Sequence, residues 1–148
     1  MKSKRTAGKS VRGVRDSEYR QLADFRYAIR TFLEFSEQAA RNAGITPQQH
    51  QALLAIRGMT EESAANLGFI AERLRVRHHS AVELVNRLAA AKLVERNEDP
   101  QDRRRVVVTL TPKAEKILQS LSATHIEELR RLKPALTAVL ALADETGR

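Results

Sequence analysis

The sequence predicts a mainly α-helical fold with one small β-hairpin. Over most of the chain, apolar residues recur every three or four positions, as they do along one face of a helix. Two short β-type runs, 93–96 and 106–110, instead flank a polar stretch of turn-forming residues. Three consecutive arginines, Arg103 to Arg105, end that polar stretch. Because such a hairpin is too small to be a domain, we expect the helices to hold it in place.

Length and composition favour one domain with a polyanionic partner. The 148 residues fit a single domain, and a hydrophobic content of 42% is enough for a core. An aromatic content of 4% means that aliphatic side chains must fill most of that core. The net charge of +8 and the pI near 10.4 indicate nucleic acid as the first candidate partner and an anionic membrane surface as the second.

Several kinds of protein are disfavoured by what the sequence lacks. It contains no cysteine, which excludes disulfides, thiolate catalysis and cysteine-based redox sensing within this chain. No apolar run approaches the ~18 residues that a membrane-spanning helix needs. The basic N-terminus is not followed by the apolar segment of a secretory signal. We therefore expect a cytoplasmic protein without a membrane partner.

Residues 1–15 are predicted to form a disordered basic arm, because they contain six basic residues, no acidic residue and little apolar content. Two interpretations stay open for this arm. It is a solvated tail, or it adds contacts to the phosphates of a nucleic acid.

The pattern predicts a long first helix over residues 16–44, with Asp16 or Ser17 as its cap and Gly44 as its end. At 1.5 Å per residue, about 26 helical residues of this region span about 39 Å, which is long for a domain of this size. Five of the six aromatic residues lie on it. Its apolar stripe comprises Leu22, Phe25, Ile29, Phe32, Ser36, Ala39 and Ala43. Such a stripe needs more cover than one small domain supplies, so we interpret this helix as part of a dimer core.

Two shorter helices are expected next. Thr46 and Gln49 can form a capping box around Pro47, which suits the first helical position, and Gly58 ends that helix. Residues 59–65 are predicted to form a loop or short turn. Asn66 can then cap a third helix over residues 67–74, whose apolar residues recur at helical spacing.

A fourth helix, over residues 78–92, follows the third after a connection of about three residues. Its apolar face comprises Ala81, Leu84, Val85 and Leu88. Its opposite face carries His79, Glu83, Asn86 and Arg87. Two short helices joined in this way predict a helix–turn–helix, whose second helix has the right width for a DNA major groove.

After the hairpin, Thr111-Pro112 predicts the start of a last helical region over residues 112–148. Pro134 is expected either to kink this helix or to begin another one. His125 lies on its apolar face, as a packed core or interface residue or as a polar or pH-sensitive contact. The apolar faces of 16–44 and 112–148 are natural partners, within one subunit and across a dimer. Residues 16–148 would then form one domain, in which these two regions are dimerisation helices and 46–111 are a winged helix.

At this point the chain resembles the MarR family of transcription regulators, over roughly residues 18–145. The stretch 67–74 matches the family's "L-x-x-x-A-x-x-L" helix, and 80–88 is similar to its recognition helix. The stretch 99–105, Asp-Pro-Gln-Asp-Arg-Arg-Arg, followed by the Leu-Thr of 110–111, resembles the family's "D-x-x-D-x-R … L-T" wing signature, which is the most specific of the three matches.

The resemblance implies a winged helix–turn–helix homodimer that binds a pseudo-palindromic operator in double-stranded DNA. Each recognition helix would enter a major groove, and each wing would enter the flanking minor groove. The family also implies a repressor that a small aromatic or phenolic effector releases from DNA. A low-specificity architectural DNA-binding protein is the alternative. An adaptor protein is disfavoured because it leaves the arginine wing without a role.

On the wing, the resemblance assigns Arg104 to the minor groove, which suits arginine because the guanidinium is weakly hydrated. Asp102 would orient Arg104 through a charge-assisted hydrogen bond. Arg103 and Arg105 would contact phosphates. A solvated hairpin end is the alternative, which the repulsion among three adjacent cations disfavours.

On the recognition helix and its turn, helical geometry separates two groups of residues. His79, Ser80 and Glu83 face outward near the N-terminal end, and Glu83 could accept a hydrogen bond from cytosine. The candidates for phosphate contacts are Arg75, Arg77, His78 and Arg87. Ordinary exposed side chains are the alternative for each of them. Arg75 and Lys92 occupy positions where the family commonly has glycine, so we expect the helix ends there to differ.

An effector would bind between the dimer core and the DNA-binding lobe, by analogy with the family. Phe25, Phe32 and His50 are weak candidates, and ordinary packing explains them equally well. The four histidines show no metal-ligand spacing, and neither a phosphate-binding glycine loop nor a nucleophile motif occurs. We therefore expect no metal, no cofactor and no enzymatic activity.

Overall fold

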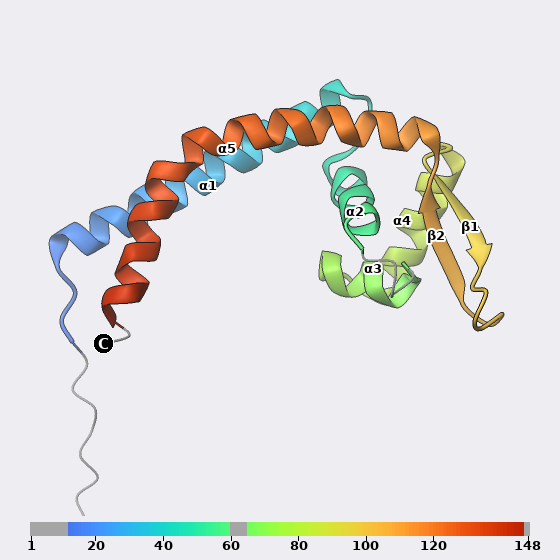
Figure 1. Cartoon of the computed structure of the whole chain (residues 1–148), viewed down its shortest axis with the longest axis horizontal. Coiled ribbons are helices and arrows are strands. Elements are labelled where there is room, and N and C mark those ends of the chain that lie inside the picture. The colour runs from blue at the N-terminus through green and yellow to red at the C-terminus, as the bar shows by residue number, and fades with distance from the viewer. Residues whose placement is uncertain (1–11, 60–64, 147–148) are drawn as a thin grey trace, which may run out of the picture.

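The described chain, residues 12–59 and 65–146 of a computed structural model, forms a helical stem with a small lobe at one end (Figure 1). The elements are α1 (Asp16–Asn42), α2 (Pro47–Arg57), α3 (Leu67–Leu74), α4 (His78–Ala90), β1 (Val94–Glu98), β2 (Val106–Leu110) and α5 (Pro112–Thr146). Helices α1 and α5 run side by side as the stem, whereas α2, α3, α4 and the hairpin make the lobe (Figure 1). This confirms the predicted class, mainly α with a β-hairpin wing.

Helix α1 begins differently from the prediction. Arg15 is its N-cap, and the Glu18 carboxylate accepts a hydrogen bond from the Arg15 backbone N–H at 2.9 Å. Asp16 and Ser17 therefore lie in the first turn, and the prediction that one of them caps the helix was wrong. Glu18 also pairs with the guanidinium groups of Arg12 and Arg15. The disordered basic arm over residues 1–15 stays a prediction, because residues 1–11 lie outside the described residues.

The end of α1 follows the prediction. Gly44 adopts a φ of +82°, which glycine reaches without steric cost. The Ile45 N–H donates to the Ala40 carbonyl and the Gly44 N–H donates to the Arg41 carbonyl. These two bonds form a Schellman motif, which satisfies carbonyls that the end of a helix leaves without partners.

The predicted caps of α2 and α3 are confirmed. Thr46 and Gln49 bond reciprocally, with 3.1 Å from the Gln49 N–H to Thr46 Oγ1 and 2.9 Å from the Thr46 N–H to Gln49 Oε1. The Phe69 N–H donates to Asn66 Oδ1 at 2.8 Å. Of the loop predicted between these helices, residues 60–64 lie outside the described part of the chain.

The expectation that the helix ends at Arg75 and Lys92 would differ from a glycine cap was wrong. Both residues adopt the left-handed conformation, with φ of 56° and 58°. An L-residue loses about 1 kcal/mol in this conformation. Backbone bonds compensate, because the Val76 N–H donates to the Ala71 carbonyl and the Leu93 N–H donates to the Leu88 carbonyl.

The hairpin pairs antiparallel, with Val94 opposite Leu110 and Glu98 opposite Val106. The Val108 N–H donates to the Ala65 carbonyl at 2.8 Å, which ties β2 to the segment just before α3. Val94 and Val108 are buried, so one face of the hairpin packs into the lobe. The wing is therefore fixed at its base while its tip projects away from the lobe (Figure 1).

Helix α5 is continuous from Pro112 to Thr146 and includes Pro134. The alternative that Pro134 begins a separate helix was wrong. The helix curves along its C-terminal half (Figure 1), as expected where a proline removes one backbone donor and crowds the preceding turn. At its start, the Ala114 N–H donates to Thr111 Oγ1 at 3.3 Å, so Thr111 caps the helix as predicted.

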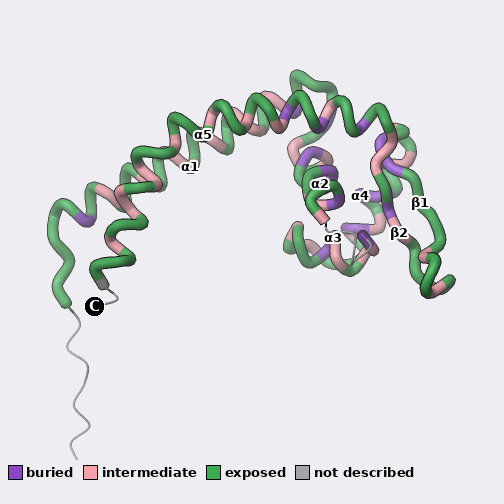
Figure 2. Tube along the Cα trace, viewed as in Figure 1, coloured by how far each residue is buried: buried purple, intermediate pink, exposed green. Residues whose placement is uncertain are grey.

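The core lies in the lobe and in the end of the stem that covers it (Figure 2). Leu53, Ile70 and Leu88 are fully buried there. Along the rest of the stem, large apolar side chains stay exposed, including Tyr27 at 73% and Ile126 at 67%. A single chain therefore does not bury the apolar face of its own stem.

Candidate nucleic-acid interface

Helix α4 presents one buried face and one open face. Ala81, Leu84, Val85 and Leu88 are buried in the lobe, as the sequence pattern predicts. The open face carries the exposed side chains of His79, Glu83, Asn86 and Arg87. Ser80 is half-buried at the edge of this face. Helix packing thus fixes α4 rigidly and leaves a polar stripe along it for a ligand.

Three further cations lie before α4 or in its first turn. Arg75, Arg77 and His78 are all exposed. Arg77 is the N-cap residue, and its side chain makes no capping hydrogen bond. Amide groups in the first turn of a helix, together with the helix dipole, favour an anion at this end. The N-terminus of α4 therefore combines amide donors with nearby positive side chains.

The wing tip is held by hydrogen bonds within its own turn. The Asp99 N–H donates to the Arg105 carbonyl, and the Arg105 N–H donates to the Asp102 carbonyl, both at 3.0 Å. The Asp99 carboxylate accepts from the Gln101 N–H at 2.9 Å. Asp102 Oδ1 accepts from the Arg104 N–H at 3.1 Å. These bonds give the seven-residue turn between Glu98 and Val106 a defined shape, so the arginines start from a fixed backbone.

Asp102 is shared between two arginines. Its carboxylate lies 3.7 Å from Arg104 Nε and 3.8 Å from Arg105 Nε. Both contacts are ion pairs whose distances exceed hydrogen-bond length. Asp102 therefore accepts a hydrogen bond from the Arg104 backbone, whereas it attracts the Arg104 guanidinium only electrostatically. The Arg104 side chain is 95% exposed, compared with 64% for Arg105. Arg104 is thus the arginine at this tip that is freest to reach another molecule, and Arg103 is exposed as well.

The structure adds Arg96, which was not among the predicted site residues. Its guanidinium donates to Asn86 Oδ1 and so connects β1 of the wing to the open face of α4. Strand alternation was the signal that could have found it. Val94 is buried toward the lobe, and a residue two positions later in a strand points to the same side. Arg96 therefore joins the recognition helix and the wing.

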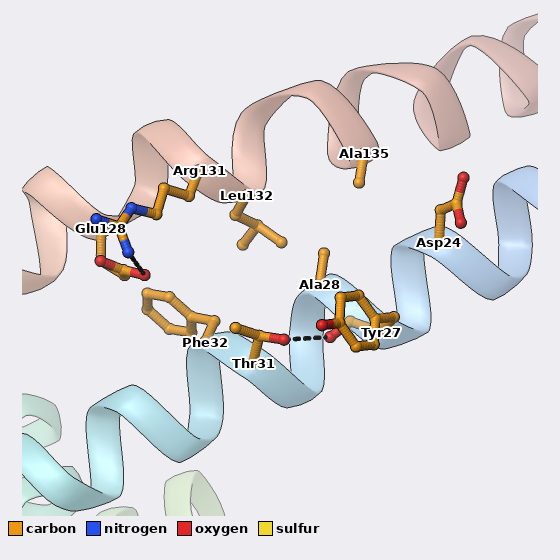
Figure 3. Close-up of a pocket in the computed structure, with 9 residues that line it drawn as sticks. All are labelled: Asp24, Tyr27, Ala28, Thr31, Phe32, Glu128, Arg131, Leu132 and Ala135. Carbon is orange, nitrogen blue, oxygen red and sulfur yellow. Dashed lines mark hydrogen bonds and ion pairs between the residues drawn. The ribbon is translucent and has the colours of Figure 1, made fainter.

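The three candidate effector residues do not line one cavity. Phe32 lines a cavity of about 300 Å³ between α1 and α5, with Tyr27, Thr31, Glu128 and Arg131 among its other lining residues (Figure 3). Phe25 and His50 do not line this cavity. Both acidic and basic side chains line the cavity. Glu128 pairs with Arg131 at 3.7 Å, and Asp24 lies on the opposite helix.

His50 instead packs at the junction of α2 with the stem. It is 5% exposed, and its ring centroid lies 4.9 Å from that of His125. Burial and the nearby His125 lower the pKa of His50 below its ordinary value. His125 is hydrogen-bonded through both ring nitrogens, which fits the prediction of a packed residue.

Residues 12–59 and 65–146 contain neither a metal-binding cluster nor a membrane-spanning helix. No cluster of three or more histidine or carboxylate side chains is arranged to hold a metal ion. Nor does any helix in these ranges have the length and apolar character needed to cross a membrane.

Comparison with known proteins shows which proteins this chain is similar to. Residues 43–105 match the model of the MarR family. The chain is 27% identical over 120 residues to YsmB, an uncharacterized HTH-type transcriptional regulator of Bacillus subtilis (strain 168), covering 78% of this chain and 80% of that protein.

Two solved structures have the same fold. AbsC, a MarR family transcriptional regulator from Streptomyces coelicolor, matches with a TM-score of 0.67 and 19% identity over 90% of each chain. A mutant of S. aureus MepR bound to an oligodeoxyribonucleotide matches with a TM-score of 0.65 and 21% identity over 88% of this chain and 98% of that one. Residues 43–105 are therefore similar to the MarR family, and the fold of the described chain is similar to that of two solved MarR-type regulators.

Proposed function

We propose that this protein is a transcriptional regulator that binds a specific pseudo-palindromic operator in double-stranded DNA as a homodimer. The exposed guanidinium of Arg104, at the tip of a wing fixed to the recognition helix, is the observation that carries the proposal. An exposed guanidinium on a projecting turn suits the narrow and electronegative minor groove. The same fold in a MepR mutant bound to an oligodeoxyribonucleotide supports this assignment.

Within the interface, we assign direct base contacts to the N-terminal part of the open face of α4. His79, Ser80 and Glu83 lie there, and Glu83 can accept a hydrogen bond from the amino group of cytosine. Phosphate contacts fall to the cations around this segment and on the wing. Those residues are Arg75, Arg77, His78, Arg87, Arg103 and Arg105.

The dimer follows from the stem. Exposed Tyr27, Ile126 and Leu129 leave an apolar surface that a second copy of α1 and α5 can cover. Two recognition helices must stand about 34–36 Å apart to enter successive major grooves. A paired stem holds both lobes in one frame and so sets this spacing, and we therefore assign α1 and α5 to dimerisation.

Repression that a small aromatic effector relieves is the finer part of the proposal. The cavity lined by Phe32 and Tyr27 offers ring contacts, and Arg131 offers a cation for a carboxylate or phenolate (Figure 3). This cavity lies along the stem, where an occupant would alter the packing of α1 on α5. Such a change would reach the spacing of the two lobes.

Selection of bound sequences from random duplex DNA, followed by titration of the selected duplex, tests the proposal. We expect a two-fold-related motif and an affinity at least ~10³-fold above that for random DNA. Comparable affinity for every duplex would instead establish a low-specificity architectural protein, which the basic composition also allows. Absence of binding to any duplex at low salt would reject both functions.

A further inference from the structure

The junction between stem and lobe contains a pair of histidine rings in contact. His50 belongs to α2 of the lobe, and His125 belongs to α5 of the stem, with ring centroids 4.9 Å apart. Phe32 and Phe35 of α1 contact the His125 ring edge-on, at 5.8 Å and 5.4 Å. Two stem helices and the first helix of the lobe therefore meet at one aromatic cluster.

The hydrogen bonds of His125 define its neutral tautomer. Nδ1 lies 2.6 Å from the Leu121 carbonyl, and Nε2 lies 2.7 Å from Ser36 Oγ. Because a carbonyl only accepts, Nδ1 carries the hydrogen and Nε2 accepts from the Ser36 hydroxyl. A proton added at Nε2 reverses the second bond, so that Nε2–H donates to Ser36 Oγ. His125 can therefore gain a proton without losing either partner.

The His50 ring, unlike that of His125, has no hydrogen-bond partner in the described part of the chain that is ready to accept an added proton. Among the described residues, no hydrogen bond to its ring nitrogens is present, and its ring is buried against that of His125. Protonation of either ring places a cation against the other ring in a largely apolar cluster. Protonation of both places two like charges on rings whose centroids are 4.9 Å apart, and these charges repel each other.

The charged groups around the pair do not neutralise it. On α5, the Glu128 side chain is one turn beyond His125, but Arg131 already pairs with it at 3.7 Å. On α1, Glu37 follows Ser36 and pairs with Arg41 at 3.7 Å, and Glu34 is exposed. On α2, Arg57 is the only other charged residue, and it pairs with Glu115 of α5. No carboxylate bonds either imidazole within the described residues.

We propose that the His50–His125 contact is a proton-operated joint, at which proton uptake separates α2 from α5 and loosens the placement of the lobe on the stem. The lowered pKa of His50 agrees with this, because it shows that the packed arrangement favours the neutral ring. The effect on DNA affinity rests on the proposed function. A loosened lobe holds the operator-binding spacing for a smaller fraction of the time, so the apparent affinity falls as the solution becomes acidic.

The separation of the lobe from the stem can be measured with spin labels and without DNA. The chain has no cysteine of its own, so only introduced cysteines are labelled. Arg30 on the stem and Glu72 on α3 are exposed and make no side-chain contact with described residues, so Arg30→Cys with Glu72→Cys accepts two spin labels. Labelled chains diluted into an excess of unlabelled chains report the distance within one subunit. We expect the distance distribution to broaden between about pH 7.5 and pH 5.5, the range in which histidines titrate.

Three variants in the labelled background assign the change. His50→Phe keeps an aromatic ring but removes its titration, and His125→Asn keeps a donor to the Leu121 carbonyl. Both should abolish the broadening. His78→Gln removes an exposed histidine of α4 and should leave the broadening as it is in the parent. An unchanged distribution in the parent, or equal broadening in His50→Phe, would overturn the proposal.

Operator affinity then tests the link to DNA. Relative to His50→Phe, which keeps the histidines of α4, we expect the parent to lose a further 3–10-fold or so in affinity over the same pH range. Equal pH dependence in the two proteins, with the broadening present, would reject the link. Failure of the parent to bind any DNA would reject the proposed function and leave the joint as measured.

Discussion

The lobe and the stem differ in how far their large apolar side chains are buried. In the lobe, Leu53, Ile70 and Leu88 are fully buried by neighbours from the same chain. On the stem, Tyr27, Ile126 and other large apolar side chains remain exposed although α1 and α5 pack along each other. The lobe therefore buries most of its large apolar side chains within one chain, whereas the stem leaves an apolar face exposed. Substitutions in the lobe should therefore lower the free energy of unfolding, whereas substitutions on the stem should change assembly.

The largest effect is expected in the lobe. Leu53 is 0% exposed on α2, and Leu53→Ala removes methyl groups and leaves a cavity. We expect the free energy of unfolding to fall by about 2–5 kcal/mol. Urea unfolding followed by circular dichroism measures this change. The matched control is Leu54→Ala on the same helix, because Leu54 is 51% exposed. Equal losses for the two variants would contradict the described core.

On the stem, the expected effect is on assembly. Ile126→Glu places a charge on the exposed apolar face of α5, and we expect it to shift a dimer to monomers at micromolar concentration. Sedimentation velocity measures the mass. Ala123→Glu, at another exposed position of the same helix, controls for charge alone. A folded parent that is monomeric at this concentration would remove the dimerisation role given to α1 and α5.

At the wing, the comparison is between neighbouring arginines. Arg104→Ala should weaken operator binding by about 1–3 kcal/mol and reduce the slope of log affinity against log salt by about one unit. Arg105→Ala should cost less, because that side chain is less exposed and shares Asp102. Fluorescence anisotropy at several salt concentrations measures both values. Unchanged affinity in Arg104→Ala would exclude the wing tip from the interface.

A smaller effect is expected where the wing joins the recognition helix. Arg96→Gln shortens the side chain and removes its charged hydrogen bond to Asn86, an exposed contact whose loss should cost about 0.5–1.5 kcal/mol of operator affinity. Asn86→Ala breaks the same contact from the other side. If the contact acts by positioning the wing on α4, the double variant should have the same operator affinity as the single variant that binds more weakly. Additive losses would mean that the two side chains act independently.

The smallest effect is a pH dependence at the far end of the stem. The Arg15 backbone N–H, the Arg15 side chain and Arg12 lower the pKa of Glu18 from 4.5 to about 2. Since the folded chain favours the ionised carboxylate, the contribution to stability is complete above pH 4.5 and is lost as the pH falls toward about 2. Thermal unfolding of Glu18→Gln against the parent should differ most above this window and converge within it. A constant difference across the window would show that Glu18 contributes through packing alone.

Predictions that depend on local chemistry were confirmed. The capping box at Thr46, the cap at Asn66 and the glycine end at Gly44 each depend on residues within a few positions of one another. The alternation of apolar residues likewise predicted the buried face of α4. The errors arose where competing local signals are close in energy. Glu18 outcompetes Asp16 and Ser17 because arginines neutralise it, and α5 absorbs Pro134 without ending.

Contacts between distant segments could not be predicted in the same way. The Arg96–Asn86 bond, the division of Asp102 between two arginines and the His50–His125 contact each depend on side-chain positions that packing decides. Sequence periodicity shows which face a residue occupies, but it does not show which residue of another helix lies opposite. The candidate effector residues illustrate this, since Phe32 lines the cavity in the stem and also contacts His125 in the cluster that holds His50, whereas Phe25 does not line that cavity.

The sequence by itself therefore determined the order of the elements, most of their caps and the face that α4 buries, because these depend on local spacing and on short motifs. The tertiary structure alone decided how the lobe is joined to the stem and which side chains meet there. The physical reason is that side chains far apart in the chain come together only when the helices have packed, and their contacts then depend on interhelical geometry that no local pattern contains.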